Sequence, residues 1–292
     1  MTSERDGLAR SVQVRLARHA REIGVDPNLV LTRFGVERFL YRLSRSRHAD
    51  RFVLKGALLL LAWLGESLRP TRDADLLGFG ELSDDELRAI FGEICEVAVE
   101  PDATTYDAGS IRVAAIRETD AYGGRRVTLR GKIGAARLRI QVDVGIGDAV
   151  TPAPAWLDYP SLLEFPAPRL RAYPRETVLA EKLHALVSLG ARNSRMKDYF
   201  DLHALLNEGR WDPAALVRAL AATFERRRTA LPEGVPVGLS DAFGGDPERE
   251  AQWRAFLGKS RLEGPSLGAV VEELRGRLET VFELARTGRG AE

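Results

Sequence analysis

Asp73 and Asp75 lie one residue apart in the stretch RPTRDADLLGFG, which follows the apolar run FVLKGALLLLAWL. The apolar residues after Asp75 indicate a strand, in which successive side chains point to opposite faces of a sheet. Both carboxylates would then share one face. Neighbouring carboxylates repel each other, and a divalent cation relieves that repulsion. The same spacing also fits a simple turn cap without a metal, so both interpretations stay open at this point.

A third carboxylate lies in the segment LRIQVDVG. The apolar residues of this segment alternate along the chain: Leu138, Ile140, Val142 and Val144. Alternation predicts a strand in which Asp143 projects from the opposite face. If this strand lies beside the one that carries Asp73 and Asp75, three carboxylates converge. Hard oxygen ligands of this kind suit Mg²⁺ (or Mn²⁺), held by a few carboxylates together with substrate phosphates.

Two charged residues lie on the apolar faces of predicted helices. Lys182 falls within the apolar stripe of ETVLAEKLHALVSL, and Asp198 within that of SRMKDYFDLHALL. Charges that face a core should not be buried unpaired, so the two residues form either a structural ion pair or part of a site. In a site, Lys182 binds a nucleotide phosphate or the leaving group, and Asp198 orients it or assists proton transfer. Four further residues are expected on the polar side or at the border of these faces: Glu181, His184, Lys197 and Asp201.

These residues need a framework of helices and strands to position them. Hydrophobic spacing predicts helices at 8–23, 28–46, 57–65, 83–98, 175–189, 195–208, 212–228 and 267–286, strands at 51–55 and 73–79, and a β-hairpin at 123–147. The fold class is therefore α+β. The predicted domain organisation is an N-terminal helical region at 1–48, an α/β core at 49–151, an irregular proline-rich connector at 152–174 and a C-terminal helical region at 175–292.

Composition and charge narrow the functional classes. With 45% hydrophobic and 29% charged residues among 292, the chain is typical of a soluble globular protein. Its net charge of +1 gives no global attraction to nucleic acid. Residues 1–51 nevertheless carry eleven arginines against six acids, and the basic faces of the first two helices are either solvated or contact a phosphate backbone. The lone Cys95 excludes an internal disulfide and favours a cytoplasmic setting. The apolar run that follows Arg51 is too short to span a membrane.

Five segments in order resemble one known family. They are FVLKGALLL, RPTRDADLL, QVDVG, YPRETVLAEKLHALVSLG and NSRMKDYFDL, and the resemblance runs from about residue 8 to beyond residue 257. Together they resemble the AbiEii/AbiGii toxin family of nucleotidyltransferases. The resemblance implies a polymerase-β-like nucleotidyltransferase core, which is a small mixed sheet with helices, flanked by N-terminal and C-terminal helical regions.

The resemblance also implies an activity and partners. Members are typically toxins of type IV-like toxin–antitoxin or phage-defence systems. Relatives transfer a nucleotide from an NTP to the 3′ end of tRNA, release pyrophosphate and block translation. Their partner is a separately encoded antitoxin, often a winged-helix regulator. Two alternatives remain: transfer of the nucleotide to a protein hydroxyl, and an inactive scaffold that acts by binding a partner.

Residue by residue, the resemblance assigns roles that the patterns alone leave open. Asp73 and Asp75 match the metal-binding D-x-D, and Asp143 matches the third strand carboxylate. Lys182 matches the lysine of the E-K-L motif, and Asp198 the first aspartate of K-D-x-x-D. The candidates for binding the NTP are Lys55, Gly56, Ala57, Thr71 and Lys197.

Two of these positions need a further remark. Thr71 matches a Ser/Thr position, and in some relatives a nearby hydroxyl is phosphorylated for neutralisation, which adds negative charge beside the metal. Gly56-Ala57 departs from the usual Gly-Ser or Gly-Gly, so a side-chain hydroxyl contact is lost. Backbone N–H groups at the start of the next helix remain able to hold phosphate oxygens.

Overall fold

The computed structural model describes residues 2–65, 70–116 and 123–287. Contacts divide the chain into two compact units. The first consists of residues 1–62, 70–147 and 155–172, and the second of residues 63–69, 148–154 and 173–292. In the described residues, all strands belong to the first unit, and the second is built from helices. The predicted α+β class is confirmed.

One mixed sheet forms the centre of the first unit. Within the described residues its strands are β1 (Phe52–Lys55), β2 (Ala74–Gly78), β3 (Thr104–Ala115), β4 (Arg125–Ile133), β5 (Ala136–Ile146), β6 (Ala155–Asp158) and β7 (Arg169–Ala172). They follow the order β3-β4-β5-β2-β1-β7-β6. β2 pairs with β5, and β1 with β7, in parallel, whereas the other pairs are antiparallel. The predicted hairpin at 123–147 is confirmed as β4 and β5.

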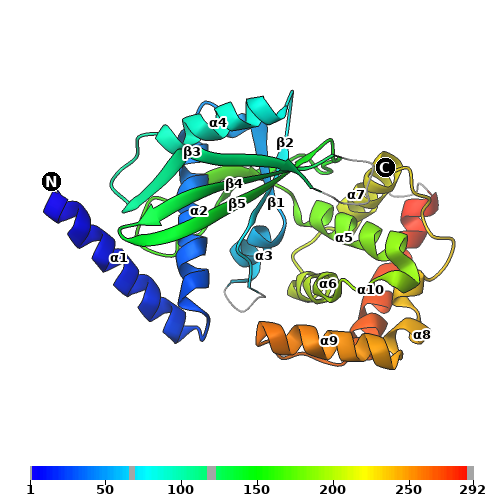
Figure 1. The fold of residues 1–292 in the computed structure, drawn as a ribbon. Helices are drawn as coiled ribbons and strands as arrows, with labels where there is room; N and C mark the ends of the chain where they lie inside the picture. Colours follow the sequence, from blue (N-terminus) through cyan, green and yellow to red (C-terminus); the bar gives the residue numbers. More distant parts are fainter. Residues whose placement is uncertain (1, 66–69, 117–122, 288–292) are drawn as a thin grey trace. The chain divides into compact units, whose positions relative to one another are not determined.

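Helices cover one face of this sheet. The helices of this part of the chain are α1 (Thr2–Glu22), α2 (Pro27–Arg45), α3 (Ala57–Leu64) and α4 (Asp84–Glu96). Figure 1 shows α2 running along the sheet behind β4 and β5. The approach is close, because a Cβ added to Gly35 of α2 would overlap Leu138 of β5. Phe39 of α2 stacks on Phe91 of α4 with ring centroids 5.5 Å apart. The apolar residues of β4 and β5 therefore face α2 and α4, and their polar residues face away.

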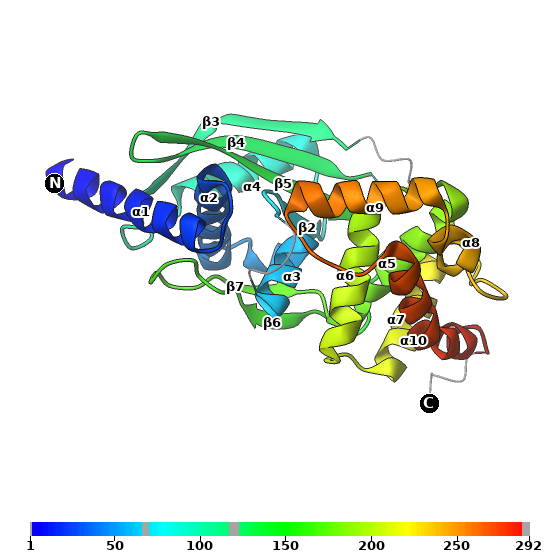
Figure 2. The same cartoon turned by 90° about the horizontal axis from the view of Figure 1, so that it is seen from below.

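The second unit is helical, as predicted. Its described helices are α5 (Arg175–Leu189), α6 (Met196–Glu208), α7 (Pro213–Arg226), α8 (Asp241–Gly244), α9 (Pro247–Ser260) and α10 (Leu267–Thr287). α10 contacts α6, α7 and α8, as Figure 2 shows. Side chains from α6 and α9 form an aromatic cluster of Phe200, Trp253 and Phe256. Across the described parts of both units, no helix combines the length and apolar character needed to cross a membrane.

Five of the described strands and α-helices lie where the sequence predicts none. They are β3, β6, β7, α8 and α9. β6 and β7 lie in the proline-rich segment that was expected to be irregular, and they form because β7 pairs with β1 and β6 with β7. β3 alternates weakly, since both of its faces carry polar residues and its register with β4 shifts between Asp107 and Arg112. Pairing with neighbouring strands, rather than local pattern, determines these strands.

A buried ionic network fixes α2 to the segment before β3. Asp102 is 2% exposed and accepts hydrogen bonds from Arg38 at 3.0 Å and from Arg42 at 2.7 and 3.2 Å. Thr104 donates its backbone N–H and its hydroxyl to the same carboxylate. Burial opposes the charge of Asp102, but the bond to Arg42 and the other donors outweigh it and lower its pKa. The α2 arginines were expected on a polar face, and for Arg38 and Arg42 that expectation is wrong because Asp102 pairs with them inside the fold.

We expect Asp102→Ala to reduce the free energy of unfolding by about 3–5 kcal/mol, because it leaves two buried guanidinium groups without their acceptor. The matched control is Asp107→Ala, which removes a half-exposed carboxylate paired with Arg130 and should cost less than about 1 kcal/mol. Urea unfolding measures both.

The pH dependence follows from the lowered pKa of Asp102. Its contribution is present above the unfolded-state pKa of about 3.9 and is lost as the pH falls through the folded-state value. The stability difference between wild type and Asp102→Ala should therefore shrink in acid. A difference that is constant down to acid unfolding would contradict an ionised Asp102.

Candidate functional site

The register of β2 and β5 brings the strand carboxylates together. Asp75 of β2 and Asp143 of β5 are directly paired neighbours on parallel strands. Neighbouring strands lie about 4.8 Å apart, and paired residues project to the same face. Asp73, two residues before Asp75, extends the row on that face. All three side chains are only partly exposed, and they lie on the face opposite the buried Leu76, Val142 and Val144.

Polar neighbours partly compensate these charges. Gln141 donates a hydrogen bond to Asp73 at 3.0 Å. Arg126 of β4 lies across from Asp143 and donates two hydrogen bonds to it, at 2.8 and 2.7 Å. Burial, together with the negative charge of Asp143, raises the pKa of Asp73. Arg126 thus binds both oxygens of Asp143, while burial and the charge of Asp143 outweigh the effect of the nearby arginines on Asp73.

The β1–α3 turn packs directly against Asp75. Lys55 is the antiparallel partner of Asp75, and Gly56 follows with a φ of +73°. A Cβ on Gly56 would overlap the Asp75 carboxylate. Only glycine provides both the left-handed backbone and the space for the carboxylate. Ala57 then begins α3, so that its first backbone N–H groups lie immediately after this turn.

A divalent cation fits the donors of this face by chemistry, since all three are carboxylates and the pKa of Asp73 is raised by burial and by the charge of Asp143. In the geometry of the described residues, however, no three acidic, histidine or cysteine side chains surround a point where a metal ion could sit. The ion pair between Arg126 and Asp143 accounts for part of this, because it directs both oxygens of Asp143 to the guanidinium.

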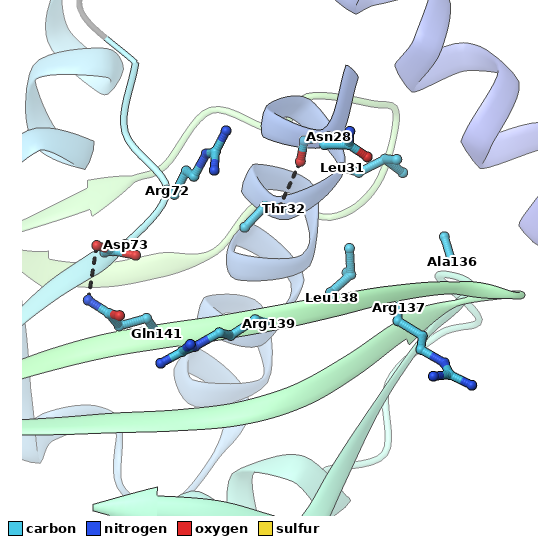
Figure 3. Close-up of a pocket in the computed structure, with 10 residues that line it drawn as sticks. All are labelled: Asn28, Leu31, Thr32, Arg72, Asp73, Ala136, Arg137, Leu138, Arg139 and Gln141. Atoms are coloured by element: carbon cyan, nitrogen blue, oxygen red, sulfur yellow. Dashed lines mark hydrogen bonds between the residues drawn. The ribbon is translucent and has the colours of Figure 1, made fainter. Parts of the chain in front are cut away.

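A hollow of about 380 Å³ borders Asp73. β5 extends past the start of β2, and the hollow opens beside this extension and the beginning of α2 (Figure 3). Its polar lining includes Asn28, Thr32, Arg72, Arg137, Arg139 and Gln141. The lining of this space beside the carboxylate row therefore includes three arginines and two amide side chains, and Figure 3 shows the guanidinium of Arg137 pointing away from Asp73. Thr71, which precedes Arg72, is partly exposed.

The second unit contains a separate buried cluster around Lys182. Its ammonium donates hydrogen bonds to Asp198 at 2.8 Å and to Asp201 at 2.7 Å. Asp198 is 2% exposed, and Nε of Arg195 lies 2.7 Å from its second oxygen. Burial alone would lower the pKa of Lys182, but the two aspartates outweigh it and raise that pKa. Burial would likewise raise the pKa of Asp198, but Lys182 outweighs it and that pKa is lowered, so the cluster stays ionised.

Two residues in and around this cluster are more buried than the sequence predicts. Asp201, expected at the border of the helix face, is fully buried and bonds Lys182 as closely as Asp198 does. His184, expected on the polar side, is buried against the ring of Phe224 on α7, 5.0 Å away. Both differences arise because helices packed on the flanks of α5 and α6 cover positions that a single-helix pattern assigns to solvent. Lys197 is exposed.

Comparison with known proteins identifies the chain's relatives. A family model described as "Nucleotidyl transferase AbiEii toxin, Type IV TA system" matches residues 38–280. No curated protein matches the sequence. Among solved structures, JHP933 from Helicobacter pylori is 15% identical, with a TM-score of 0.47 over 86% of this chain and 89% of that one. An antigenic nucleotidyltransferase-like protein from Paracoccidioides brasiliensis is 13% identical, with a TM-score of 0.40 over 85% and 92%. The assignment therefore rests on the family model.

Gly56→Ala should destabilise the protein more than Gly24→Ala. The two glycines have nearly equal φ values, +73° and +72°, so both variants incur the cost of a left-handed alanine, about 1–2 kcal/mol. Only the Cβ at position 56 overlaps another group, the Asp75 carboxylate, whereas the space around Gly24 is open. We expect Gly56→Ala to lose about 1–3 kcal/mol more in urea unfolding. Equal losses would show that Asp75 moves aside freely.

Proposed function

The chain belongs to the AbiEii family of nucleotidyltransferase toxins of type IV toxin–antitoxin systems, and from this premise we propose that it transfers a nucleoside monophosphate from an NTP to the 3′ end of tRNA and so blocks translation. The family shows the enzyme class, and it implies an NTP substrate and an antitoxin partner. The finer proposal adds the tRNA acceptor, a dependence on Mg²⁺ or Mn²⁺, a winged-helix antitoxin, a role in phage defence and action in the cytoplasm.

The single observation that carries the proposed chemistry is the row of carboxylates on paired parallel strands. We assign Asp73, Asp75 and Asp143 to holding the cation. When bound there, Mg²⁺ would supply activation of the attacking 3′-hydroxyl and stabilisation of the departing pyrophosphate. The 3′-hydroxyl loses its proton to solvent, its oxygen forms the new bond to the α-phosphorus of the NTP, and the bond from that phosphorus to the pyrophosphate oxygen breaks. The turn at Lys55, Gly56 and Ala57 presents a cation and backbone N–H groups for the triphosphate.

For Lys182 and Asp198 we propose roles in charge stabilisation and orientation. An ammonium has three N–H donors, and Lys182 uses two of them on Asp198 and Asp201. Its side chain is 13% exposed, and we assign its third donor to a phosphate oxygen. Asp198 and Asp201 fix the ammonium in one direction, which lets it stabilise developing charge without reorganisation. Lys197, exposed on the same helix, is assigned to the phosphates as a weaker contact.

Thr71 is the proposed site of neutralisation. It is partly exposed and lies two residues before Asp73. A phosphate on its hydroxyl would bring further negative charge close to a carboxylate whose pKa is already raised by burial and by Asp143. That charge would disfavour the triphosphate.

Incubation with total tRNA, Mg²⁺ and each α-labelled NTP in turn tests the function. We expect label in tRNA with at least one NTP, and a loss of about a hundredfold or more in Asp75→Asn and in Lys182→Met. Asp107→Asn, which changes an exposed carboxylate of β3, is the matched control and should keep full activity. Label in protein instead of RNA would identify a protein acceptor. Cell toxicity that survives Asp75→Asn would contradict an enzymatic toxin.

Arg126→Gln tests whether the cation competes with the guanidinium for Asp143. The substitution frees both carboxylate oxygens and removes a positive charge, so Mn²⁺ should bind about fivefold more tightly, which corresponds to about 1 kcal/mol. Electron paramagnetic resonance of free Mn²⁺ measures the binding without catalysis. Arg130→Gln is the control, because Arg130 also lies on β4 and pairs with a carboxylate across the strand, Asp107. Weaker Mn²⁺ binding in Arg126→Gln would mean that Arg126 positions Asp143 for the cation.

A further inference from the structure

Like charges face each other across the exposed side of the β4–β5 hairpin. Arg130 is the direct partner of Arg139, and Lys132 is the direct partner of Arg137. All four are exposed, and alternation places them on the face opposite the buried Leu129. Direct like-charge pairs destabilise an antiparallel ladder, so this arrangement opposes folding rather than supporting it. We call these four residues the basic strip.

Little negative charge lies against the basic strip. Asp107 pairs with Arg130 at 2.8 Å, while no described acidic side chain forms an ion pair with Lys132, Arg137 or Arg139. Exposed arginines present a planar fork that matches phosphate oxygens. A row of such cations on an otherwise nearly neutral chain, whose net charge is +1, indicates a polyanionic ligand.

The basic strip is continuous with the hollow beside Asp73. Arg137 and Arg139 belong to the strip and also line the hollow, as Figure 3 shows. The strip's far end, at Arg137, is six residues along β5 from Asp143, which is roughly 20 Å at strand spacing. A chain of phosphates that follows the strip would therefore end at the carboxylate row.

We propose that the basic strip binds the phosphodiester backbone of the acceptor RNA and that the RNA's 3′-terminal nucleotide occupies the hollow beside Asp73. This rests on the proposed function in taking RNA as the acceptor, and it adds the surface that the RNA uses. Arg72 and Arg139, which both line the hollow, are assigned to the terminal phosphate, and the amides of Asn28 and Gln141 are donors and acceptors for the terminal nucleoside. Single-stranded RNA is held in this way, by a positively charged surface that follows the backbone.

The buried arginines of α2 are less suited to this role. In α2, Arg38 and Arg42 are buried and bound to Asp102, so they are not available to a ligand. Exposed arginines remain on α1, and four of them equal the basic strip in number: Arg5, Arg10, Arg18 and Arg21. They provide a control of identical charge.

Equilibrium binding of fluorescently labelled total tRNA, measured over a range of salt concentrations without NTP, tests the proposal. The strip variant carries Arg130→Gln, Lys132→Gln, Arg137→Gln and Arg139→Gln, and the control variant carries glutamine at the four α1 positions. Each lost phosphate contact reduces the slope of log K against log salt by about 0.7, so the strip variant should lose about 3. The control should keep the wild-type slope. Binding of each NTP with Mn²⁺ should be unchanged in both.

Several results would overturn the basic strip as the RNA surface. They are an unchanged slope in the strip variant, an equal loss in the control, a loss of NTP binding instead of RNA binding, or no RNA binding by the wild type. Because the substitutions remove like-charge contacts, the strip variant should be at least as stable as the wild type in urea, so a weakened slope cannot be attributed to unfolding. If the wild type binds RNA through the basic strip but transfers no label to it, the proposed function is contradicted and the basic strip remains the RNA-binding surface.

Discussion

The parallel pairing of β2 with β5 is the constraint on which the first unit's chemistry depends. It holds Asp75 and Asp143 at one inter-strand spacing, where two carboxylates repel each other unless positive charge is near. The pairing of β4 with β5 places Arg126 opposite Asp143, and its positive charge offsets part of this repulsion. The β1–β2 pairing places Lys55 beside Asp75. Every strand adjacent to the carboxylate row thus contributes a cation, and their compensation is still incomplete at Asp73.

The two units balance their charges in different ways. The side chain of Arg126 is 43% exposed, so its bond to Asp143 is weak, and another cation can replace it. Lys182 is enclosed with Asp198 and Asp201, and loss of any one of the three would leave a buried charge without its partner. An exchangeable pair suits a place where ions and substrates enter and leave. A fixed cluster suits a charge that must keep one position throughout a reaction.

Much of this arrangement could be predicted from the sequence, because it follows from the regular spacing of apolar residues in strands and helices. The two-residue period of a strand placed Asp143 on the same face as the other carboxylates. The spacing of apolar residues along the helices placed Lys182 and Asp198 on the faces that point to the core. The partner of Asp143 could also be predicted from the sequence. The two-residue turn at Gly134-Ala135 fixes the register of the hairpin and places Arg126 opposite Asp143. The burial of Asp201 and His184 could not be predicted in this way, because it depends on which helix packs on each flank of α5 and α6. Nor could β6 and β7, which have little pattern of their own and form by pairing.

The sheet separates stability from function by using its two faces differently. On the covered face, apolar residues pack against α2 and α4, and the Asp102 network ties α2 to the segment before β3. The other face carries the repulsive contacts, among them the row of carboxylates and the like-charge pairs of β4 and β5. Because strand residues alternate, each functional charge occupies a position that the core does not need. Gly56 is an exception, because the fold and the carboxylate row both require it. Its left-handed backbone forms the turn after β1, and the absence of a side chain leaves room for the Asp75 carboxylate.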